Sequence, residues 1–290
     1  MNNKMVSLPS TLWMSVCGLD GSGKSTLVAN LGKRMTELGM RVKTSRLPHD
    51  RYLVTDLLNV SNDPYTDRML FALDNRLFAE RFKGWQNSGE YDVILTQRCF
   101  LDSYVHGAVQ GFDYAWISEL NRINDLPKCQ IIIHLVAEAE TAYARIKDDE
   151  DADKFEYIEY IRKQERETRR AYYEVTHGNR DLEHFSDAVH IYVDTTQMST
   201  EETFEYVKKR LDEIGFFYLW ESEKSPMLHI FEAWDSSFLL PNAYFSQKHF
   251  RKEDKYTKGC NLSLSYCIKL MFFKHFYFFN PSINNWIFYF

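Results

Sequence analysis

The sequence predicts an α/β fold with three layers, in which a five-stranded parallel sheet is flanked by helices. Stretches with the pattern of strands alternate with stretches that have the pattern of helices along the first 213 residues. Two expected strands, 91–96 and 130–136, are almost continuously apolar, which is typical of strands covered on both faces. Such alternation joins parallel strands by right-handed crossovers, and sheets of this kind bind ligands at the carboxyl ends of their strands.

The other strands are predicted from short apolar runs bounded by turn residues. Residues 12–17 form a buried strand that leads into a glycine-rich loop. Residues 41–46 form a second strand, which ends before Pro48, and a last strand is expected over 189–193.

The helices are predicted from apolar residues at helical spacing. This spacing indicates a helix over 24–38 that Gly39 ends. Pro64 is expected to begin a long helix that continues to residue 88. One side of that helix is expected to be apolar, with Met69, Leu70, Leu73, Leu77 and Phe78. Further helices are expected over 138–147, 154–177 and 200–213.

Composition and charge exclude several classes of protein. The 290-residue chain has a formal charge of −6, so we expect no nucleic-acid partner. Its five cysteines are scattered and form no CxxC pair, which argues against a disulfide framework and a zinc site. Neither a signal peptide nor an apolar run of about 18 residues is recognisable. We therefore expect a cytoplasmic protein with no membrane partner.

Residues 214–290 are predicted to be a C-terminal extension of unknown fold and role. Phe and Tyr are dense in its last part, 263–290, which lacks acidic side chains and a clean period. This part could be a membrane-surface segment or an extra layer packed on the main domain. It could also be an aggregation-prone tail.

The most informative motif follows the first strand. Residues 18–26 read GLDGSGKST and match the phosphate-loop pattern GxxxxGK[ST]. Its glycines let backbone N–H groups turn toward phosphates, and the helix that follows adds positive potential. Lys24 is expected to reach the β- and γ-phosphates, and the Ser25 hydroxyl is expected to ligate Mg²⁺. The expected ATP-binding residues are Gly18, Gly21, Ser22, Gly23, Lys24, Ser25 and Thr26.

Other landmarks, together with this loop, resemble the thymidylate kinase family of P-loop nucleoside monophosphate kinases over about residues 11–213. Asp20 lies inside the loop, Arg46 follows the second strand and Arg98 follows the third. The long helix contains LFALDNR over 70–76, which is similar to the family's LFxxDR motif. The resemblance implies ATP- and Mg²⁺-dependent phosphorylation of a deoxynucleoside monophosphate, with dTMP as the first choice, by direct in-line transfer. It also implies a possible homodimer.

The resemblance implies a role for each of these residues in binding the acceptor. Asp20 would hold the sugar hydroxyl, while Arg46 and Arg98 would contact the phosphate. Phe71 would stack on the base, and Arg76 would reach the edge of the base. The three arginines also have a structural interpretation as solvated or ion-paired side chains, and Phe71 could be a core residue.

A closing lid is expected over about residues 146–156. Because charge grows on the transferring oxygens in the transition state, a cation on this lid is expected. Lys154, in a segment that resembles the family's DRxE lid motif, is the first candidate, and Arg145 is the second. The expected catalytic residues are Lys24, Asp20, Arg98 and Lys154.

Several arginines are expected because two anionic ligands must meet in one cleft. A triphosphate and a monophosphate bring about five or six negative charges within a few ångströms, which is costly in a low-dielectric site. Planar guanidinium groups offset this repulsion and fix the geometry of transfer.

The sequence departs from the family at Gln97, where an acid usually precedes the arginine and supports Mg²⁺. We expect Asp102 to substitute, so that Ser25 and Asp102 are the expected metal residues. A missing carboxylate base favours a monophosphate over a nucleoside as the acceptor, although Asp20 or Asp102 could serve as the base. His106 is expected to face the cleft from a helix or loop rather than to act as a catalyst.

Two alternatives to a deoxynucleoside monophosphate kinase stay open. One keeps the fold but phosphorylates a deoxynucleoside or another nucleotide. The other is a nucleotide-binding protein with little catalytic activity, as Gln97 and the arginine-poor lid suggest.

Overall fold

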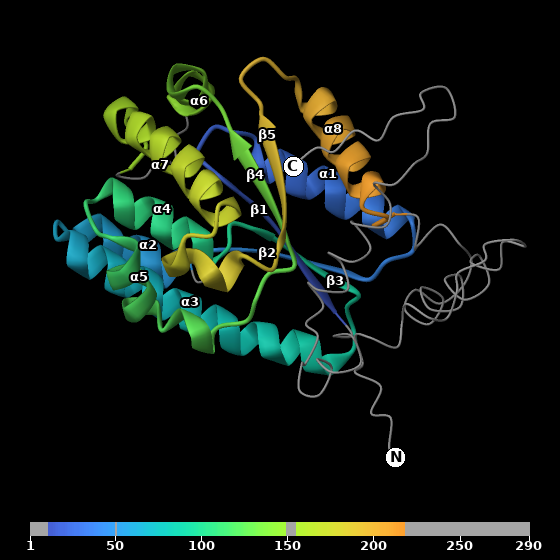
Figure 1. Ribbon diagram of the computed structural model, residues 1–290, viewed down its shortest axis with the longest axis horizontal. Helices are drawn as coiled ribbons and strands as arrows, with labels where there is room; N and C mark the ends of the chain where they lie inside the picture. Colours follow the sequence, from blue (N-terminus) through green and yellow to red (C-terminus); the bar gives the residue numbers. More distant parts are fainter. Residues whose placement is uncertain (1–10, 50, 149–154, 218–290) are drawn as a thin grey trace, which may run out of the picture. The chain divides into compact units, whose positions relative to one another are not determined.

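The computed structural model describes residues 11–49, 51–148 and 155–217. At its centre lies a sheet of five parallel strands in the order β2-β3-β1-β4-β5 (Figure 1). The strands are β1 (Leu12–Gly18), β2 (Val42–Arg46), β3 (Val93–Gln97), β4 (Ile131–Val136) and β5 (Val189–Asp194). The predicted five-stranded parallel sheet is therefore confirmed. Strand β1 lies between β3 and β4, so β2 and β3 extend the sheet to one side of β1 and β4 and β5 extend it to the other. In such sheets a crevice forms at the carboxyl end of the strand where the order reverses, here β1.

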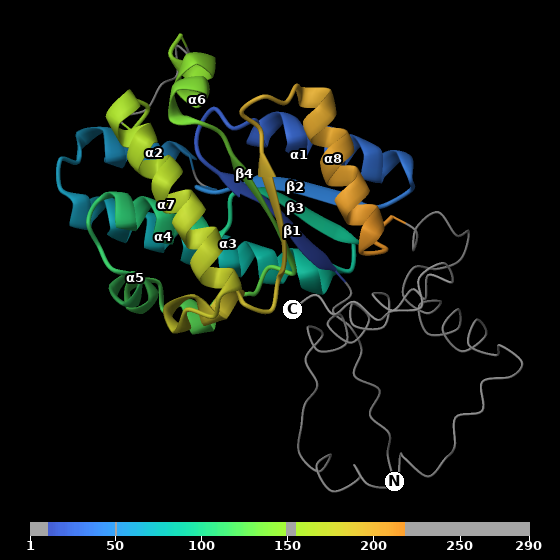
Figure 2. The same cartoon turned by 45° about the horizontal axis from the view of Figure 1, so that its top comes forward.

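Helices cover both faces of the sheet (Figures 1 and 2). One face is covered by α1 (Lys24–Glu37) and α8 (Thr200–Glu213). The other is covered by α3 (Pro64–Ser88), α4 (Phe100–Val109) and α7 (Ile158–Thr176). The three predicted layers are thus present.

Alternate residues of β1 supply the two hydrophobic cores. Met14 and Val16 belong to the core beneath α1 and α8, which also contains Leu31 and Leu211. Trp13 points to the opposite face, where it packs against Phe78, Phe82 and Phe100 at ring-centroid distances of 4.9 to 5.4 Å. The indole nitrogen of Trp13 donates to Thr96 Oγ1 at 2.9 Å, so this buried ring leaves no donor unsatisfied.

The predicted helices are present, and several short helices are additional. Helix α3 begins and ends where the sequence predicts, with the Asp63 side chain accepting from the backbone N–H groups of Tyr65 and Thr66 at its start. The additional elements are α2 (Arg51–Val60), α4, α5 (Tyr114–Asn121), η1 (Ile123–Asp125) and η2 (Arg180–Phe185). The predicted helix 138–147 is α6 (Ala139–Ile146), and the predicted helix 154–177 corresponds to α7.

The expected apolar side of α3 needs a correction. Met69, Leu73 and Leu77 are 53%, 49% and 37% exposed, whereas Phe78 and Phe82 are buried. The side that carries Met69, Leu73 and Leu77 is therefore exposed. Phe78 packs toward the sheet, and Leu70 packs against a separate cluster that contains Leu58 and Tyr160. Part of that inward face is polar, because it borders the cavity described below.

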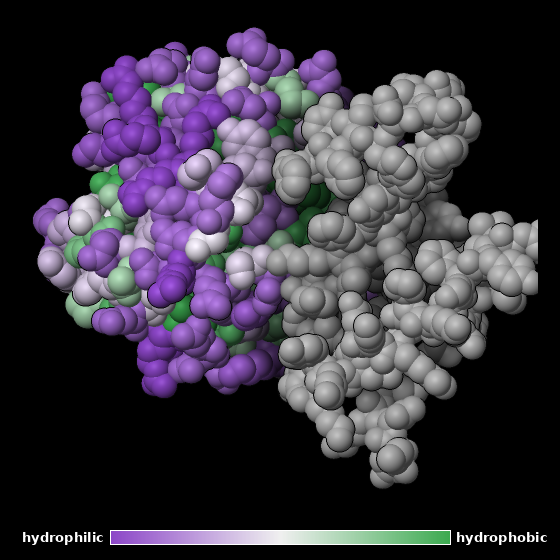
Figure 3. Space-filling model, viewed as in Figure 1, coloured by the Kyte–Doolittle hydropathy of each residue, from purple (hydrophilic) through white to green (hydrophobic). Residues whose placement is uncertain are grey.

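Some expectations fall where the structure offers no description. Lys154 and most of the expected lid lie outside the described residues, as does the extension beyond residue 217. The domain boundary after residue 213 therefore stays a prediction. The described part of the face in Figure 3 is largely hydrophilic, with apolar residues in small patches. No helix in the described ranges is both long enough and apolar enough to cross a membrane.

Candidate active site

The phosphate loop connects β1 to α1 and depends on its glycines. Gly18, Gly21 and Gly23 have φ angles of 142°, 77° and 95°, in a region that side chains with a Cβ rarely adopt. A Cβ on Gly18 would lie 1.9 Å from Leu135 O, and one on Gly21 would lie 2.1 Å from Ala142 O. A Cβ on Gly23 would meet nothing within 4 Å. The first two glycines therefore allow close packing of the backbone, whereas the third only supplies the turn into α1.

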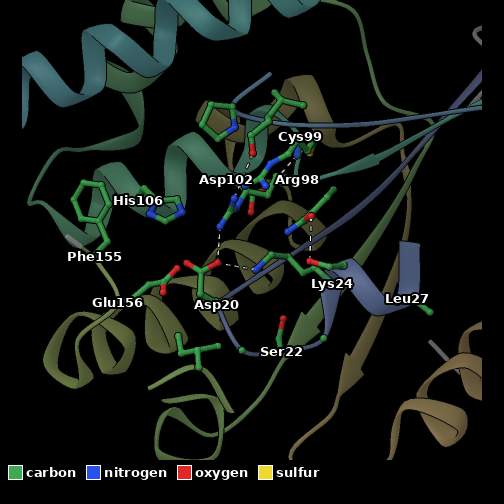
Figure 4. Close-up of a pocket in the computed structure, with 18 of the residues that line it drawn as sticks. Asp20, Ser22, Lys24, Leu27, Arg98, Cys99, Asp102, His106, Phe155 and Glu156 are labelled. Carbon is green, nitrogen blue, oxygen red and sulfur yellow. Dashed lines mark hydrogen bonds and ion pairs between the residues drawn. The ribbon is translucent and has the colours of Figure 1, made fainter. Parts of the chain in front are cut away.

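Three charged side chains meet beside the loop (Figure 4). Lys24 Nζ donates to Leu19 O at 2.7 Å and to Asp20 Oδ1 at 3.1 Å. Arg98 Nη2 donates to the same oxygen of Asp20 at 2.5 Å. Arg98 directly follows β3, and its φ angle of 68° turns it back across the end of β1. Two cations thus share one carboxylate at the carboxyl ends of the central strands.

Burial makes the electrostatics of this cluster strong. Burial alone would raise the pKa of Asp20, but Arg98 and Lys24 outweigh it and hold the pKa of this carboxyl well below its usual range. Burial lowers the pKa of Lys24, and its attraction to Asp20 opposes that shift. Asp20 is therefore an anion. It pairs with Lys24 and Arg98 until a ligand competes with it for these two cations.

The cluster lies in a cavity of about 920 Å³. This cavity runs from the phosphate loop to the inward face of α3, and it also receives residues from α4, α6 and the turn after β5. The predicted site residues that line it are Asp20, Gly21, Ser22, Gly23, Lys24, Ser25, Thr26, Arg46, Phe71, Arg98 and Asp102. Gly18 lies just before them, at the end of β1. The structure thus gathers nearly all of the predicted residues around one cavity.

Oxygen atoms suited to Mg²⁺ lie at the start of α1. Ser25 Oγ donates to Gln97 Oε1 at 3.3 Å, so the residue in place of the usual acid reaches the loop hydroxyl directly. Asp102 lines the cavity but is buried, and its carboxylate accepts from the backbone N–H of Cys99 at 3.0 Å as the cap of α4. Its other close neighbours are the thiols of Cys17 and Cys99, which do not suit Mg²⁺.

Arg76 does not reach the cavity, which corrects its expected contact with the base. Its guanidinium donates to Asn121 O at 2.8 Å and lies 3.8 Å from an oxygen of Asp125. The reason is the period of the helix. Arg76 follows Phe71 by five residues, which is about 140° around α3, whereas a residue four positions away returns to the same face.

The face of α3 that borders the cavity carries two residues that sequence reasoning missed, Arg68 and Asn75. Both line the cavity together with the predicted Phe71, at the spacing i, i+3 and i+7 of one helix face. The signal was available in the sequence, because this spacing is the one used to find apolar faces. It was missed because Met69, Leu70 and Leu73 suggested a different inward face.

Two further residues complete the wall. Arg145, the second candidate for a lid cation, lines the cavity and donates to Gly21 O at 3.2 Å and to Thr195 O at 2.9 Å. His106 faces the cavity from α4 (Figure 4), and its Nδ1 atom lies 2.9 Å from Tyr160 Oη. Burial, aided by the cations of Arg68 and Arg98, lowers the pKa of His106 to about 3. This histidine is therefore neutral, and it faces the cleft from a helix as predicted.

The parallel sheet, the glycine loop between β1 and α1, and the buried lysine define the class of P-loop nucleotide-binding α/β proteins. Comparisons with known proteins identify the family. The family model for thymidylate kinase matches residues 16–189, and the chain therefore belongs to the thymidylate kinase family. The family predicted from the sequence landmarks is thus confirmed.

Individual relatives agree with the family model. A probable thymidylate kinase from Methanopyrus kandleri is 29% identical over 210 residues, which are 70% of this chain and 93% of the relative. One from Sulfurisphaera tokodaii is 28% identical over 165 residues, 55% of this chain and 83% of the relative. The solved structure of thymidylate kinase from Candida albicans superposes with a TM-score of 0.52 and 15% identity, over 71% of this chain and 93% of that one. The fold is thus shared with a protein of quite different sequence.

Proposed function

We propose that the protein transfers the γ-phosphoryl group of ATP to dTMP, which gives dTDP and ADP. The observation that carries this proposal is the buried group of Asp20, Lys24 and Arg98 at the phosphate loop. Two cations beside the phosphate loop support the proposal, because a triphosphate and a monophosphate would need such charges where they meet. Membership of the thymidylate kinase family supplies the acceptor, and the relatives bear the name of that activity.

The chain's own residues can perform the transfer by positioning and by electrostatic stabilisation. Lys24 has three donor hydrogens, of which two are engaged by Leu19 O and Asp20, so it can turn toward the β- and γ-phosphates of ATP. Arg98 and Arg46 line the same cavity and would bind the phosphate of dTMP. Asp20, released from part of its ion pairing, would accept a hydrogen bond from the sugar hydroxyl. The acceptor phosphate is already an anion, so this transfer needs no general base.

The phosphate loop offers oxygen atoms that suit Mg²⁺, although the two protein ligands, Ser25 and Gln97, are neutral. Ser25 Oγ and Gln97 Oε1 are hard oxygen donors of the kind that Mg²⁺ accepts, and the triphosphate would supply the negative charge. When bound, the ion would neutralise charge on the transferring phosphates. Asp102 is the second proposed metal residue. Because its carboxylate is buried behind the loop, it would support the ion through Ser25 and would not contact it directly.

A substitution at Asp102 tests that second role. Asp102→Asn should keep the cap of α4, because the amide oxygen can still accept from Cys99 N. If Asp102 supports the metal, the Mg²⁺ concentration at half-maximal turnover should rise by roughly tenfold. Unchanged Mg²⁺ dependence would leave Ser25 and Gln97 as the metal residues.

A panel of acceptors distinguishes the proposed function from its rivals. The protein is incubated with ATP, Mg²⁺ and, in turn, dTMP, dCMP, dGMP, dAMP and thymidine, and ADP release is measured. We expect turnover with dTMP to exceed that with thymidine by orders of magnitude. Turnover with thymidine alone would favour a nucleoside kinase. Binding of ATP without acceptor-dependent turnover would favour a binding protein.

Two coarser properties accompany the proposal. A cytoplasmic location fits an enzyme that draws on ATP and deoxynucleotides. A homodimer is proposed from the resemblance to the family, and sedimentation of the full chain at two concentrations tests it.

A further inference from the structure

Three side chains of the kind that binds metal ions lie together beside the cavity. They are Cys17, Cys99 and Asp102, which are all buried, and their ligand atoms lie within 4.8 Å of one another. The sulfur atoms of Cys17 and Cys99 are 3.2 Å apart. In a tetrahedral site, sulfur and oxygen ligands of one ion lie about 3 to 4 Å from each other. The three groups are therefore already close to the spacing that a single ion requires.

The fold brings these residues together from separate parts of the chain. Cys17 lies near the end of β1, and Cys99 lies two residues beyond β3, the neighbouring strand. Because Val16 pairs with Gln97 across the two strands, sulfur atoms 82 positions apart in the sequence come into contact. Asp102 joins them from the first turn of α4. The absence of a CxxC pair argued against a zinc site in the sequence, but a site assembled from neighbouring strands contains no such pair.

The group has a route to solvent and an open position. Cys99 and Asp102 line the cavity (Figure 4), which gives an ion a path of entry. One carboxylate oxygen of Asp102 accepts from the Cys99 N–H at 3.0 Å, and the second oxygen can bind an ion while α4 stays capped. A water molecule from the cavity would complete the set, as in zinc sites that have three protein ligands.

We propose that Cys17, Cys99 and Asp102 form a binding site for a thiophilic divalent cation, with Zn²⁺ as the first choice. Thiolate ligands favour such ions over Mg²⁺ and Ca²⁺. Binding releases the protons of both thiols to solvent and changes no oxidation state. Two thiolates and a carboxylate exceed the charge of the ion by one unit, and the cation of Arg98, directly before Cys99, offsets this excess. The site is distinct from the proposed Mg²⁺ site and does not depend on kinase activity.

The first test uses Co²⁺ as a probe in the wild-type protein. Thiolate ligands give Co²⁺ a charge-transfer absorption band, and tetrahedral geometry strengthens its visible bands. The full chain is freed of metal with a chelator and reduced with a phosphine, and its free thiols are counted before Co²⁺ is added. We expect both bands, their loss when Zn²⁺ displaces Co²⁺, and their persistence in a large excess of Mg²⁺. Absence of the charge-transfer band from the reduced protein would overturn the proposal.

The second test locates the ion among the cysteines. Cys17→Ser and Cys99→Ser each replace a thiolate ligand with a hydroxyl group, so each should weaken Zn²⁺ binding, measured by competition with Co²⁺, on the order of 100-fold or more. Cys129→Ser is the matched control, because this buried thiol donates to the backbone oxygens of Trp13 and Ile131. It should bind Zn²⁺ like the wild type. Unchanged binding in both Cys17→Ser and Cys99→Ser would place the ion on other residues and refute the site.

A third measurement needs no substitution, so it decides the matter even if a variant does not fold. Crystals of the Zn²⁺-loaded wild-type protein are measured at the zinc absorption edge, where anomalous scattering locates the ion. The peak should lie about 2.3 Å from the sulfur atoms of both Cys17 and Cys99. A peak at other residues only would contradict the proposal. None of these measurements depends on turnover, so failure of the proposed kinase function would leave their outcome unaffected.

Discussion

The two ends of the cavity are built in different ways. At the phosphate end, nine consecutive residues of the loop supply the backbone turn, the lysine and the hydroxyl. At the α3 end, the wall comes from residues spaced three and four apart along a helix, such as Arg68, Phe71 and Asn75. The loop therefore appears as a motif in the sequence, whereas the helix face appears only when the phase of the helix is known.

The difference extends to electrostatics. At the loop, Lys24 and Arg98 share Asp20 as a partner, so one carboxylate offsets part of their positive charge before any ligand binds. On α3, the guanidinium nitrogens of Arg68 have no hydrogen-bond partner among the described residues. The two cations of the phosphate end are thus held by a carboxylate of the same loop, whereas the guanidinium of Arg68 is held by packing beside Phe71. The experiments below test each end in turn.

The largest effect is expected from Lys24 at the phosphate end. Lys24→Ala removes the cation expected at the β- and γ-phosphates, and kcat with ATP and dTMP should fall on the order of 10³-fold. Steady-state ADP release measures the loss, and circular dichroism checks that the fold is kept. A fall of less than about tenfold would mean that the loop holds ATP without contributing to transfer.

Next come the glycines of the same loop. In Gly21→Ala the new Cβ would lie 2.1 Å from Ala142 O, at a φ of 77°, so the free energy of unfolding should fall by about 3 kcal/mol. The matched control is Gly23→Ala, whose Cβ would meet nothing within 4 Å and should cost only about 1 kcal/mol. Urea unfolding measures both. Equal losses would show that backbone strain, and not contact with α6, sets the requirement for glycine.

Much of the fold could be predicted because its signals are local. Buried parallel strands are short apolar runs, and the boundaries of α3 follow from Pro64 and Gly89. Helix α4 was missed because its start is capped by Cys99 and Asp102, and Cys is an unusual residue at that position. Helix α5 has only eight residues and a weak apolar period of its own, so its existence depends on tertiary packing.

Prediction of the site residues from the sequence was limited by the phase of helix α3. Asp20, Arg46 and Arg98 lie at strand ends, and the parallel sheet brings such ends together without further information. Arg76 was chosen because it completes a linear pattern, but the five-residue step from Phe71 turns it away. Arg68 precedes the pattern and could be found only from the i, i+3 relation to Phe71.

A smaller effect concerns His106, which packs beside the α3 end. Its pKa of about 3 in the folded protein lies below the ordinary value of 6.5. At pH 5 the unfolded chain therefore binds a proton there that the folded chain does not, and stability is lost as the pH falls below about 6.5. Between pH 7.5 and pH 5 this loss should be about 2 kcal/mol.

His106→Gln removes the titrating group and tests this contribution. The free energy of unfolding, measured by urea at both pH values, should depend on pH by about 2 kcal/mol less in the variant than in the wild type. The other buried histidines are present in both proteins and cancel in the difference. An identical pH dependence would mean that His106 is protonated in the folded protein, which is incompatible with its burial beside two arginines.

The smallest effect is expected on the outward face of α3, and it separates the two faces of that helix. Leu73 is 49% exposed, so Leu73→Ala should change the free energy of unfolding by less than about 0.5 kcal/mol. Phe78, on the inward face, is fully buried, and Phe78→Ala should cost about 3 to 5 kcal/mol. Both are measured by urea unfolding at two protein concentrations tenfold apart. A loss above about 1 kcal/mol for Leu73→Ala that grows with concentration would show that a second copy of the chain covers this face, because only then does the substitution remove a packed contact.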